Sequence, residues 1–252
     1  MKLLTLARDI RRRRARERQG LFVAEGVRAV EELLASPLVV RGVLAAPQLT
    51  DAPRGEELLE LARRRGVDLA QVGEREFASA AETESPQGVL AIAEIPGRRL
   101  LDLELPARAR LVVLDAVQDP GNVGTIVRTS AALGSAAVLA MPGTVDLWNA
   151  KVVRSAMGAL FHNPAYMCTW AELDTFRSGN AVALWGADAQ GTPLERLRPP
   201  DRLAVVVGNE GAGLSSQGRA RIDQFVSIPI DATVESLNVA VATGIILYRL
   251  RS

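Results

Sequence analysis

The stretch "LVVLDAVQDPGNVGTIVRTSAALG" (residues 111–134) decides the fold class of the C-terminal part of this chain. It begins as an apolar strand, turns at Pro120 and Gly121, and continues as a helix. Many nucleotide-binding loops begin in this way, but the Gly-x-x-Gly spacing of Gly121 and Gly124 is not that of a dinucleotide fingerprint. We expect Asn122 to cap the helix and Arg128 to reach back over the loop. An ordinary capped helix, with Arg128 paired to a carboxylate, is the alternative interpretation.

The remainder of the C-terminal half repeats this alternation of strand and helix. Further strands are predicted at 136–140, 181–186, 203–207 and 225–230, and helices at 123–133, 149–158, 170–178, 214–222 and 234–250. The strands are continuous apolar runs, which predicts that both faces of a mostly parallel sheet are covered by helices. Ligands of such sheets bind beyond the carboxyl ends of the strands.

Two more polar, glycine-rich segments follow predicted strands. "VVVGNEGAGLSS" (residues 205–216) places three glycines within six residues, and "FVSIPIDATVESLNVAVATGIILYRL" (residues 225–250) leads into a helix that Ser236 could cap. A tight turn and a packing helix are the structural alternatives. Neither segment carries a Walker A or dinucleotide motif, so enzymes of those classes are disfavoured.

The N-terminal half predicts a smaller α/β domain. Residues 3–18 form a predicted basic helix, and residues 1–20 hold eight Lys or Arg although the whole chain has a net charge of only +1. Such a segment favours a polyanionic partner, RNA or DNA, over a membrane, with a solvated helix as the alternative. We divide the chain into a basic N-terminal helix with a small α/β domain (1–96), a linker (97–109) and a C-terminal domain (110–252).

Single cysteine and histidine residues limit the chemistry. Cys168 cannot form an intrachain disulfide, and His162 alone excludes histidine metal clusters and a Ser-His-Asp triad, so we expect no metal. We predict that His162 is structural and Cys168 buried. No apolar run is long enough to span a bilayer, and the first apolar stretch is too short for a secretory signal; we expect a cytoplasmic protein.

Taken together and in this order, three segments resemble the signature motifs of SpoU-type RNA ribose 2′-O-methyltransferases of the SPOUT class. They are "DPGNVGTIVRTSAALG", "VVVGNEGAGL" and "SIPIDATVESLNVAVATG", and "VRSAMGALFHNP" (residues 153–164) resembles the family's connecting segment. More loosely, "FVAEGVRAVEELL" is similar to the small RNA-binding N-terminal domain of many members, which has the ribosomal protein L30e fold.

The resemblance implies properties that spacing alone does not give. The C-terminal domain would be an α/β fold with a trefoil knot, with its last helix threaded through a loop, and would bind S-adenosylmethionine as a homodimer. The implied catalytic residues are Asn122, Arg128, Glu210, Ser236 and Asn238. The implied cofactor-binding residues are Gly208, Gly211, Ile228 and Leu237. The predicted contacts to substrate RNA are Arg8, Arg11, Arg12, Arg13, Arg14 and Glu25.

The implied reaction is methyl transfer to a ribose 2′-hydroxyl of structured RNA, with large-subunit rRNA favoured by the basic start and the N-terminal domain. Because guanidinium stays protonated, we expect Arg128 to hold a phosphate and stabilise developing negative charge rather than act as a base. A tRNA methyltransferase, a resistance enzyme acting on rRNA, and a non-catalytic RNA-binding or ribosome-assembly protein are the alternatives.

Overall fold

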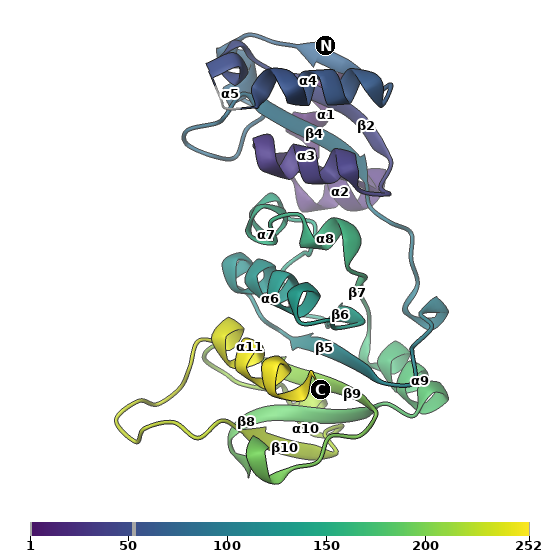
Figure 1. The fold of residues 1–252 in the computed structure, drawn as a ribbon, viewed down its shortest axis with the longest axis vertical. Coiled ribbons are helices and arrows are strands. Elements are labelled where there is room, and N and C mark those ends of the chain that lie inside the picture. Colours follow the sequence, from purple (N-terminus) through teal and green to yellow (C-terminus); the bar gives the residue numbers. More distant parts are fainter. Residues whose placement is uncertain (1, 52–53, 252) are drawn as a thin grey trace. The chain divides into compact units, whose positions relative to one another are not determined.

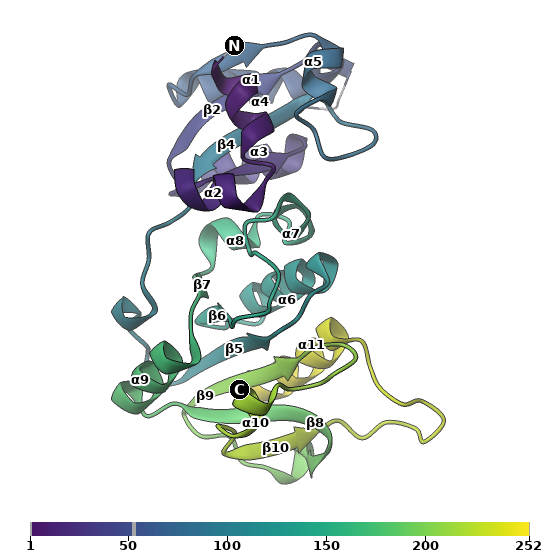
Figure 2. The same cartoon turned by 180° about the vertical axis from the view of Figure 1, so that it is seen from behind.

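A computed structural model describes residues 2–51 and 54–251. The chain divides into one unit of Met1–Gly97 with Trp148–His162, and another of Arg98–Leu147 with Asn163–Ser252. Figures 1 and 2 trace the chain through both units. Residues 148–162 thus pack with the N-terminal part, whereas the sequence pattern places them in the C-terminal domain. The aromatic residues of this segment explain the difference, because the rings of Trp148 and Phe161 lie 4.5 and 5.8 Å from the ring of Phe22.

The first unit is built on a four-stranded sheet with the strand order β1-β4-β2-β3. Strand β4 pairs antiparallel with β1 and β2, and β2 pairs parallel with β3. The strands are β1 (Leu21–Glu25), β2 (Val40–Ala45), β3 (Leu69–Gln71) and β4 (Val89–Glu94). The helices are α1 (Lys2–Asp9), α2 (Arg13–Gln19), α3 (Val27–Ala35), α4 (Gly55–Arg64), α5 (Glu74–Ala78), α7 (Ala150–Ser155) and α8 (Ala159–His162), with a 3₁₀ turn, η1, at Pro47–Asp51.

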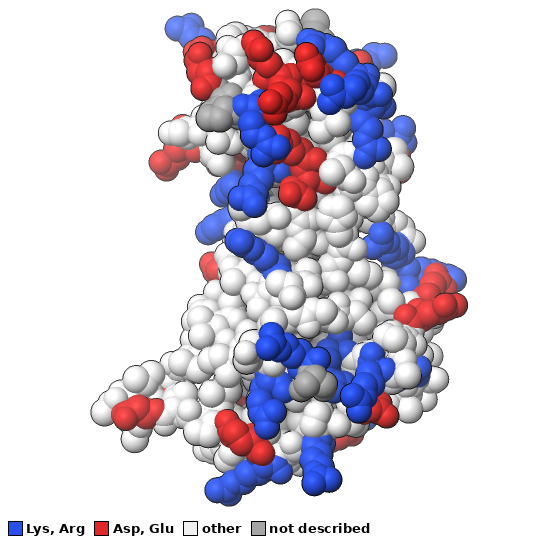
Figure 3. All heavy atoms as spheres, viewed as in Figure 1, with Lys and Arg blue, Asp and Glu red and all other residues white. Residues whose placement is uncertain are grey.

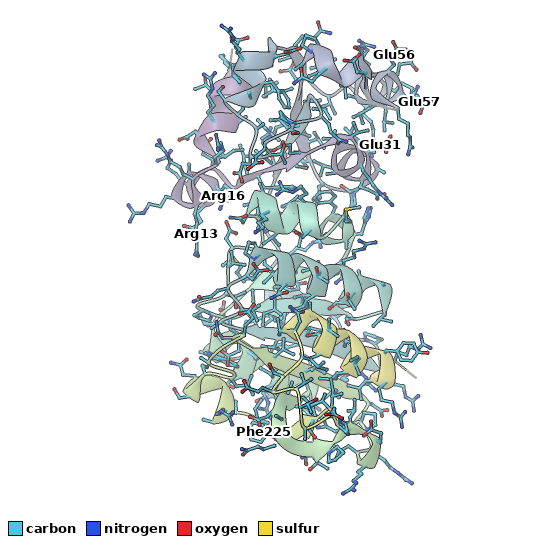
Figure 4. All side chains as sticks on the ribbon, turned by 90° about the vertical axis from the view of Figure 1, so that its left-hand side faces the viewer. Arg13, Arg16, Glu31, Glu56, Glu57 and Phe225 are labelled. Carbon is cyan, nitrogen blue, oxygen red and sulfur yellow. The ribbon has the colours of Figure 1, made fainter. Side chains whose placement is uncertain are left out.

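The basic start of the chain is two helices rather than the single predicted one. The break lies between α1 and α2, where the side chain of Arg16 donates hydrogen bonds to the carbonyl oxygens of Ile10 (3.1 Å) and Arg11 (2.7 Å). Helix ends leave such carbonyl groups without intrahelical donors, and the guanidinium of Arg16 supplies the missing donors. Arg16 is buried for this reason, whereas Arg13 on the same helix is exposed (Figure 4).

The second unit holds a six-stranded sheet in the order β10-β8-β9-β5-β6-β7, and every pairing in it is parallel. The strands are β5 (Ala109–Asp115), β6 (Ala137–Ala140), β7 (Ala165–Met167), β8 (Ala183–Pro193), β9 (Arg202–Gly208) and β10 (Gln224–Ser227). The helices are α6 (Pro120–Ala132), α9 (Trp170–Asn180), α10 (Ser216–Arg219) and α11 (Val239–Leu250), with 3₁₀ turns η2 (Leu100–Asp102) and η3 (Leu194–Arg196). The predicted mostly parallel sheet is therefore confirmed.

Helices cover both faces of this sheet, as the continuous apolar strands predict. Leu111 to Leu114 of β5 are all fully buried, although successive side chains point to opposite faces. Leu111 and Val113 share one core with α9 residues, while α6 and α11 contact each other and the neighbouring strands (Figure 1).

Several predicted boundaries differ from the structure. Strand β7 is not among the strands predicted for the C-terminal half. The predicted helix 234–250 begins only at Val239, the helix 214–222 shortens to α10, and the helix 149–158 ends at Ser155 before α8 begins. Residues 228–238 are instead a loop that projects from the sheet edge before α11 (Figures 1 and 2). The segment predicted as a linker contains η2, whose Leu100 is buried in the core of the second unit.

Candidate active site

Three loops gather at one edge of the parallel sheet. They follow β5, which ends at Asp115, β9, which ends at Gly208, and β10, which ends at Ser227. The parallel register pairs Asp115 with Gly208, so the first two loops start side by side. This is the carboxyl edge, where sheets of this kind bind their ligands.

A hydrogen-bonded chain of three side chains joins these loops. The Nδ2 of Asn238 donates to the Oδ1 of Asn122 (2.9 Å), and the Nδ2 of Asn122 donates to the Oε1 of Glu210 (2.9 Å). The orientation of the Asn238 amide is fixed, because its Oδ1 accepts from the backbone N–H of Ala240 (2.9 Å), which leaves its Nδ2 to donate to Asn122. Residues separated by more than a hundred positions thus form one polar unit, and it contains three of the five predicted catalytic residues.

Both predicted helix caps are wrong. The observed caps explain why the side chain of Asn122 can join the three loops. Asp119 caps α6 by accepting from the backbone N–H of Asn122 (2.7 Å), with Pro120 in the first turn. Asn238, not Ser236, caps α11. Because Asp119 performs the capping, the side-chain amide of Asn122 is free to bridge the other two loops.

A pocket of about 750 Å³ lies against the second and third loops. Its lining includes all four predicted cofactor-binding residues and three of the predicted catalytic residues. These are Gly208, Gly211, Ile228, Leu237, Glu210, Ser236 and Asn238. The volume is in the range of pockets that enclose a small molecule.

Gly208 allows the second loop to fold back on its own strand. A Cβ at this position would lie 2.3 Å from the carbonyl carbon of Gly213 and 2.5 Å from the backbone nitrogen of Leu214. Both neighbours are backbone atoms, so no side chain fits without moving the loop. The backbone of the loop therefore forms the pocket wall directly.

Asn209 holds this loop, although it is not among the predicted site residues. Its Oδ1 accepts from the backbone N–H groups of Gly211 and Ala212 (both 3.0 Å), and its Nδ2 donates to the carbonyl oxygen of Ala116 (3.1 Å). Two backbone hydrogen bonds of 2.9 Å between Asn209 and Gly213 close the turn. An asparagine that bonds the backbone two residues ahead is a common turn device, and this signal is present in the sequence.

Acidic side chains supply all the charge on the described lining of the pocket. They are Asp188, Glu210 and Glu235. Hydrogen bonds from the backbone N–H of Gln190 and from Arg219 lower the pKa of Asp188, despite the opposing effect of its burial. Because Arg219 pairs with Asp188 from outside the pocket, the carboxylates of Glu210 and Glu235 are the ones that favour a ligand carrying positive charge.

Arg128 lies in the middle of α6 with an exposed side chain. Within the part of the chain that the structure describes, it has neither a hydrogen bond nor an ion pair through its guanidinium. The alternative of a structural arginine paired with a carboxylate is thus not supported. Arg128 does not line the pocket, and it lies about 9 Å further along the helix axis than Asn122, at about 1.5 Å per residue.

In the first unit, the predicted RNA-contacting residues fall into distinct environments. Arg8 of α1 donates to the Oγ of Ser79 (2.8 Å), and Arg11, just after α1, donates to the Ser79 carbonyl oxygen (3.1 Å), so both hold the start of the chain against the C-cap of α5. Arg13 pairs with Glu17 at 2.7 Å.

The remaining three predicted contacts separate into free cations and one buried acid. Arg12 and Arg14 are exposed, and their guanidinium groups have no partner in residues 2–51 and 54–251. Glu25 is buried, and its carboxylate accepts from the backbone N–H of Glu82 (2.8 Å) and from the hydroxyl of Thr83. Glu25 therefore holds the loop at residues 82–83, and a direct RNA contact by Glu25 stays a prediction.

Cys168 and His162, the only cysteine and the only histidine of the sequence, lie outside the pocket. Burial raises the pKa of the Cys168 thiol to about 12, with the Glu172 carboxylate adding to the effect. His162 ends α8, with its Nε2 3.9 Å from Glu32. No helix in the described part of the chain is long and apolar enough to cross a membrane.

Comparison with known proteins identifies two regions of this chain. Residues 109–248 match the SpoU rRNA methylase family, and residues 5–91 match an MRM3-like substrate-binding domain. A 23S rRNA (guanosine(2553)-2′-O)-methyltransferase of Bacillus subtilis is 36% identical over 241 residues, which cover 95% of this chain and 92% of that protein.

Streptomyces viridochromogenes provides both a similar sequence and a similar solved structure. The 23S rRNA (uridine(2479)-2′-O)-methyltransferase of Streptomyces viridochromogenes is 30% identical over 252 residues, covering 94% of this chain and 84% of that protein. The SpoU methyltransferase AviRb of Streptomyces viridochromogenes, solved in complex with AdoMet, superposes with a TM-score of 0.90 at 28% identity, covering 98% and 96% of the two chains. The three motifs, the fold and these relatives all point to the same family. This chain belongs to the SpoU rRNA methylase family.

Proposed function

We propose that this protein transfers a methyl group from S-adenosylmethionine to a ribose 2′-hydroxyl of 23S rRNA. The observation that carries the proposal is the chain from Asn238 through Asn122 to Glu210 beside a pocket of small-molecule size. The named substrates of the relatives and the AdoMet-bound structural neighbours support the same activity.

The pocket fits the proposed cofactor by shape and charge. Gly208 leaves a cradle that a Cβ would fill, and the charged lining is acidic. When bound there, S-adenosylmethionine would supply a methyl group on a positively charged sulfonium, which the acidic lining would favour. We assign its binding to Gly208, Gly211, Ile228 and Leu237.

The polar chain and Arg128 act on the RNA side of the reaction. Methyl transfer forms an oxygen–carbon bond, breaks a sulfur–carbon bond and releases the hydroxyl proton, so the main requirement is alignment of the ribose with the methyl group. Asn122 and Asn238 hold the three loops in register, Ser236 lies in the adjacent wall, and Glu210 orients the Asn122 amide. Arg128, whose cation is uncompensated, would hold the target phosphate and stabilise negative charge developing on the ribose oxygen.

The first unit would bind the RNA backbone. Arg12 and Arg14 are exposed cations without partners in the described residues and are the strongest candidates. Arg13 would exchange its exposed Glu17 pair for a phosphate at small cost, because exposed ion pairs contribute about 0–1 kcal/mol. Arg8 of α1 and Arg11, in the turn that follows it, would contribute further contacts.

We also propose a homodimer, a knot and a cytoplasmic location. Helix α11 leaves Val241, Ile245 and Tyr248 exposed at helical spacing, a stripe that a second copy of the chain would cover. The proposed knot would thread α11 through a preceding loop, and its contacts with α6 and β9 are compatible with this. An rRNA substrate favours the cytoplasm.

The test combines turnover with cofactor binding. We expect S-adenosylmethionine to bind in calorimetry and Arg128→Ala to lose methyl transfer to 23S rRNA by about 100-fold or more, as for other groups that stabilise developing charge. The dissociation constant for the cofactor should stay within about twofold of the parent value, since Arg128 does not line the pocket. Near-normal turnover of Arg128→Ala would refute its role, and absence of cofactor binding would favour a non-catalytic RNA-binding protein.

A further inference from the structure

An arginine-rich surface lies in the second unit, at the amino-terminal ends of the parallel strands, whereas the pocket lies at their carboxyl ends. It is formed by three segments, 108–110, 198–202 and 249–251, which hold six arginines and a single carboxylate, Asp201. The segments adjoin one another because the guanidinium of Arg110 donates to the carbonyl oxygens of Leu250 (2.9 Å), Pro200 (3.1 Å) and Asp201 (2.7 Å). We call these three segments the arginine surface.

The charge of the arginine surface is poorly compensated. Among the residues that the structure describes, Arg110 and Arg202 donate their side-chain hydrogen bonds to carbonyl oxygens and to no carboxylate. Burial is the main cause that lowers the pKa of Arg110; the charge of Arg108 adds to this effect, and the charge of Asp201 opposes it. Figure 3 shows Lys and Arg gathered over this end of α11.

Two arginines of this surface are exposed and unpaired. Arg198 and Arg249 have no side-chain hydrogen bond or ion pair within the described ranges. Arg108 pairs with Asp201 at 3.2 Å, and Arg251 lies over the ring of Tyr248 at 3.8 Å. The surface thus offers free cations to an anionic partner, while Arg110 and Arg202 maintain its shape.

The position of the surface determines which partner fits. Residues 109 and 202 begin β5 and β9, whereas the pocket lies where these strands end, six residues later. At about 3.3 Å per residue the two sites are separated by about 20 Å. A small molecule cannot occupy both, but an RNA with its reactive ribose at the pocket extends over this distance and presents phosphates along it.

We propose that the arginine surface is a second contact for the substrate RNA, binding backbone phosphates remote from the methylated ribose. This inference rests on the proposed rRNA substrate and adds a contact within the methyltransferase unit to the contacts expected from the N-terminal arginines. Phosphate contacts carry no base specificity, so the surface positions the RNA without selecting the nucleotide.

The test is the salt dependence of rRNA binding by the double variant Arg198→Ala/Arg249→Ala. Each lost phosphate contact lowers the slope of log K against log salt concentration by about 0.7–0.9, so the double variant should lose about 1.4–1.8 from the slope. The dissociation constant for S-adenosylmethionine should be unchanged. Arg99→Ala is the matched control, because Arg99 is an exposed arginine of the same unit whose charge is compensated by Asp102 at 2.7 Å.

The possible results separate this inference from the proposed function. A slope that falls in the double variant but not in Arg99→Ala supports the surface as an RNA contact. If the parent protein binds 23S rRNA and the double variant retains the full slope, the inference is overturned. If the parent protein itself does not bind rRNA, the proposed function fails together with the inference.

Discussion

Replacement of Gly208 by alanine tests how the pocket wall is built. The added Cβ would lie 2.3 Å from the carbonyl carbon of Gly213, 2.4 Å from its oxygen and 2.5 Å from the nitrogen of Leu214. Normal carbon contacts are about 3.5–4.0 Å, so the 209–214 loop has to move by about 1 Å or more. The two 2.9 Å backbone hydrogen bonds between Asn209 and Gly213 lie directly in its path.

The expected loss of cofactor affinity in Gly208→Ala follows from those two hydrogen bonds. At about 0.5–1.5 kcal/mol each, their loss costs about 1–3 kcal/mol. If this cost falls on the cofactor-binding conformation, the dissociation constant for S-adenosylmethionine rises by roughly 5- to 150-fold. Isothermal titration calorimetry measures this change directly.

A matched variant separates the local effect from a general loss of stability. Gly179 lies in α9 of the same unit, and a Cβ added there meets no atom within 4 Å. Gly179→Ala should therefore bind the cofactor like the parent protein. Thermal unfolding of both variants identifies a temperature at which each is folded. A Gly208→Ala protein that is folded and binds S-adenosylmethionine with the parent affinity would refute the reasoning.

Three further predictions concern other parts of the molecule. Asn122→Ala breaks the bridge between Glu210 and Asn238 and should lower the single-turnover rate constant for RNA methylation by about 30-fold or more, from two hydrogen bonds of which one is to a carboxylate; an unchanged single-turnover rate constant would contradict this. Cys168, with its raised pKa, should resist alkylation by iodoacetamide at pH 8 and react fully after denaturation, as mass spectrometry would reveal. The lowered pKa of Asp188 contributes stability that is present above its unfolded pKa of about 3.9 and is lost as pH falls through the folded value. Asp188→Asn should therefore lose less unfolding free energy than the parent protein when the pH is lowered from 6 to 3 in denaturant titrations, and an equal loss would argue against this contribution.

Local sequence patterns predict the sheet and the gathering of the three loops. Continuous apolar runs such as residues 203–207 are typical of strands covered on both faces, and parallel strands bring the segments after them to one edge. The three segments that carry Asn122, Glu210 and Asn238 can thus be brought to one edge from the strand pattern, whereas the resemblance to SpoU-type enzymes singles out these residues. Their direct hydrogen bonding depends on side-chain orientation, which the sequence does not encode locally.

Other features depend on residues far apart in the chain. Strand β1 lacks polar alternation because α7, from a distant part of the sequence, packs against it. The caps of α6 and α11 are ambiguous in the sequence because Asp119 and Asn122, or Ser236 and Asn238, are equally suitable capping residues, and only the final backbone path decides between them. Arg16 cannot be recognised as a structural residue within a basic run, since its role requires the break between α1 and α2.

A methylation map of 23S rRNA tests the central claim most directly. Total RNA is taken from cells that lack this protein and incubated with the purified protein and labelled S-adenosylmethionine. The 23S rRNA and the tRNA are then separated and analysed nucleotide by nucleotide for ribose methylation. The proposed function predicts one new 2′-O-methyl group at a defined nucleotide, absent when Arg128→Ala replaces the parent protein. Label that appears on a base, label that appears only on tRNA, or no transfer at all would contradict it.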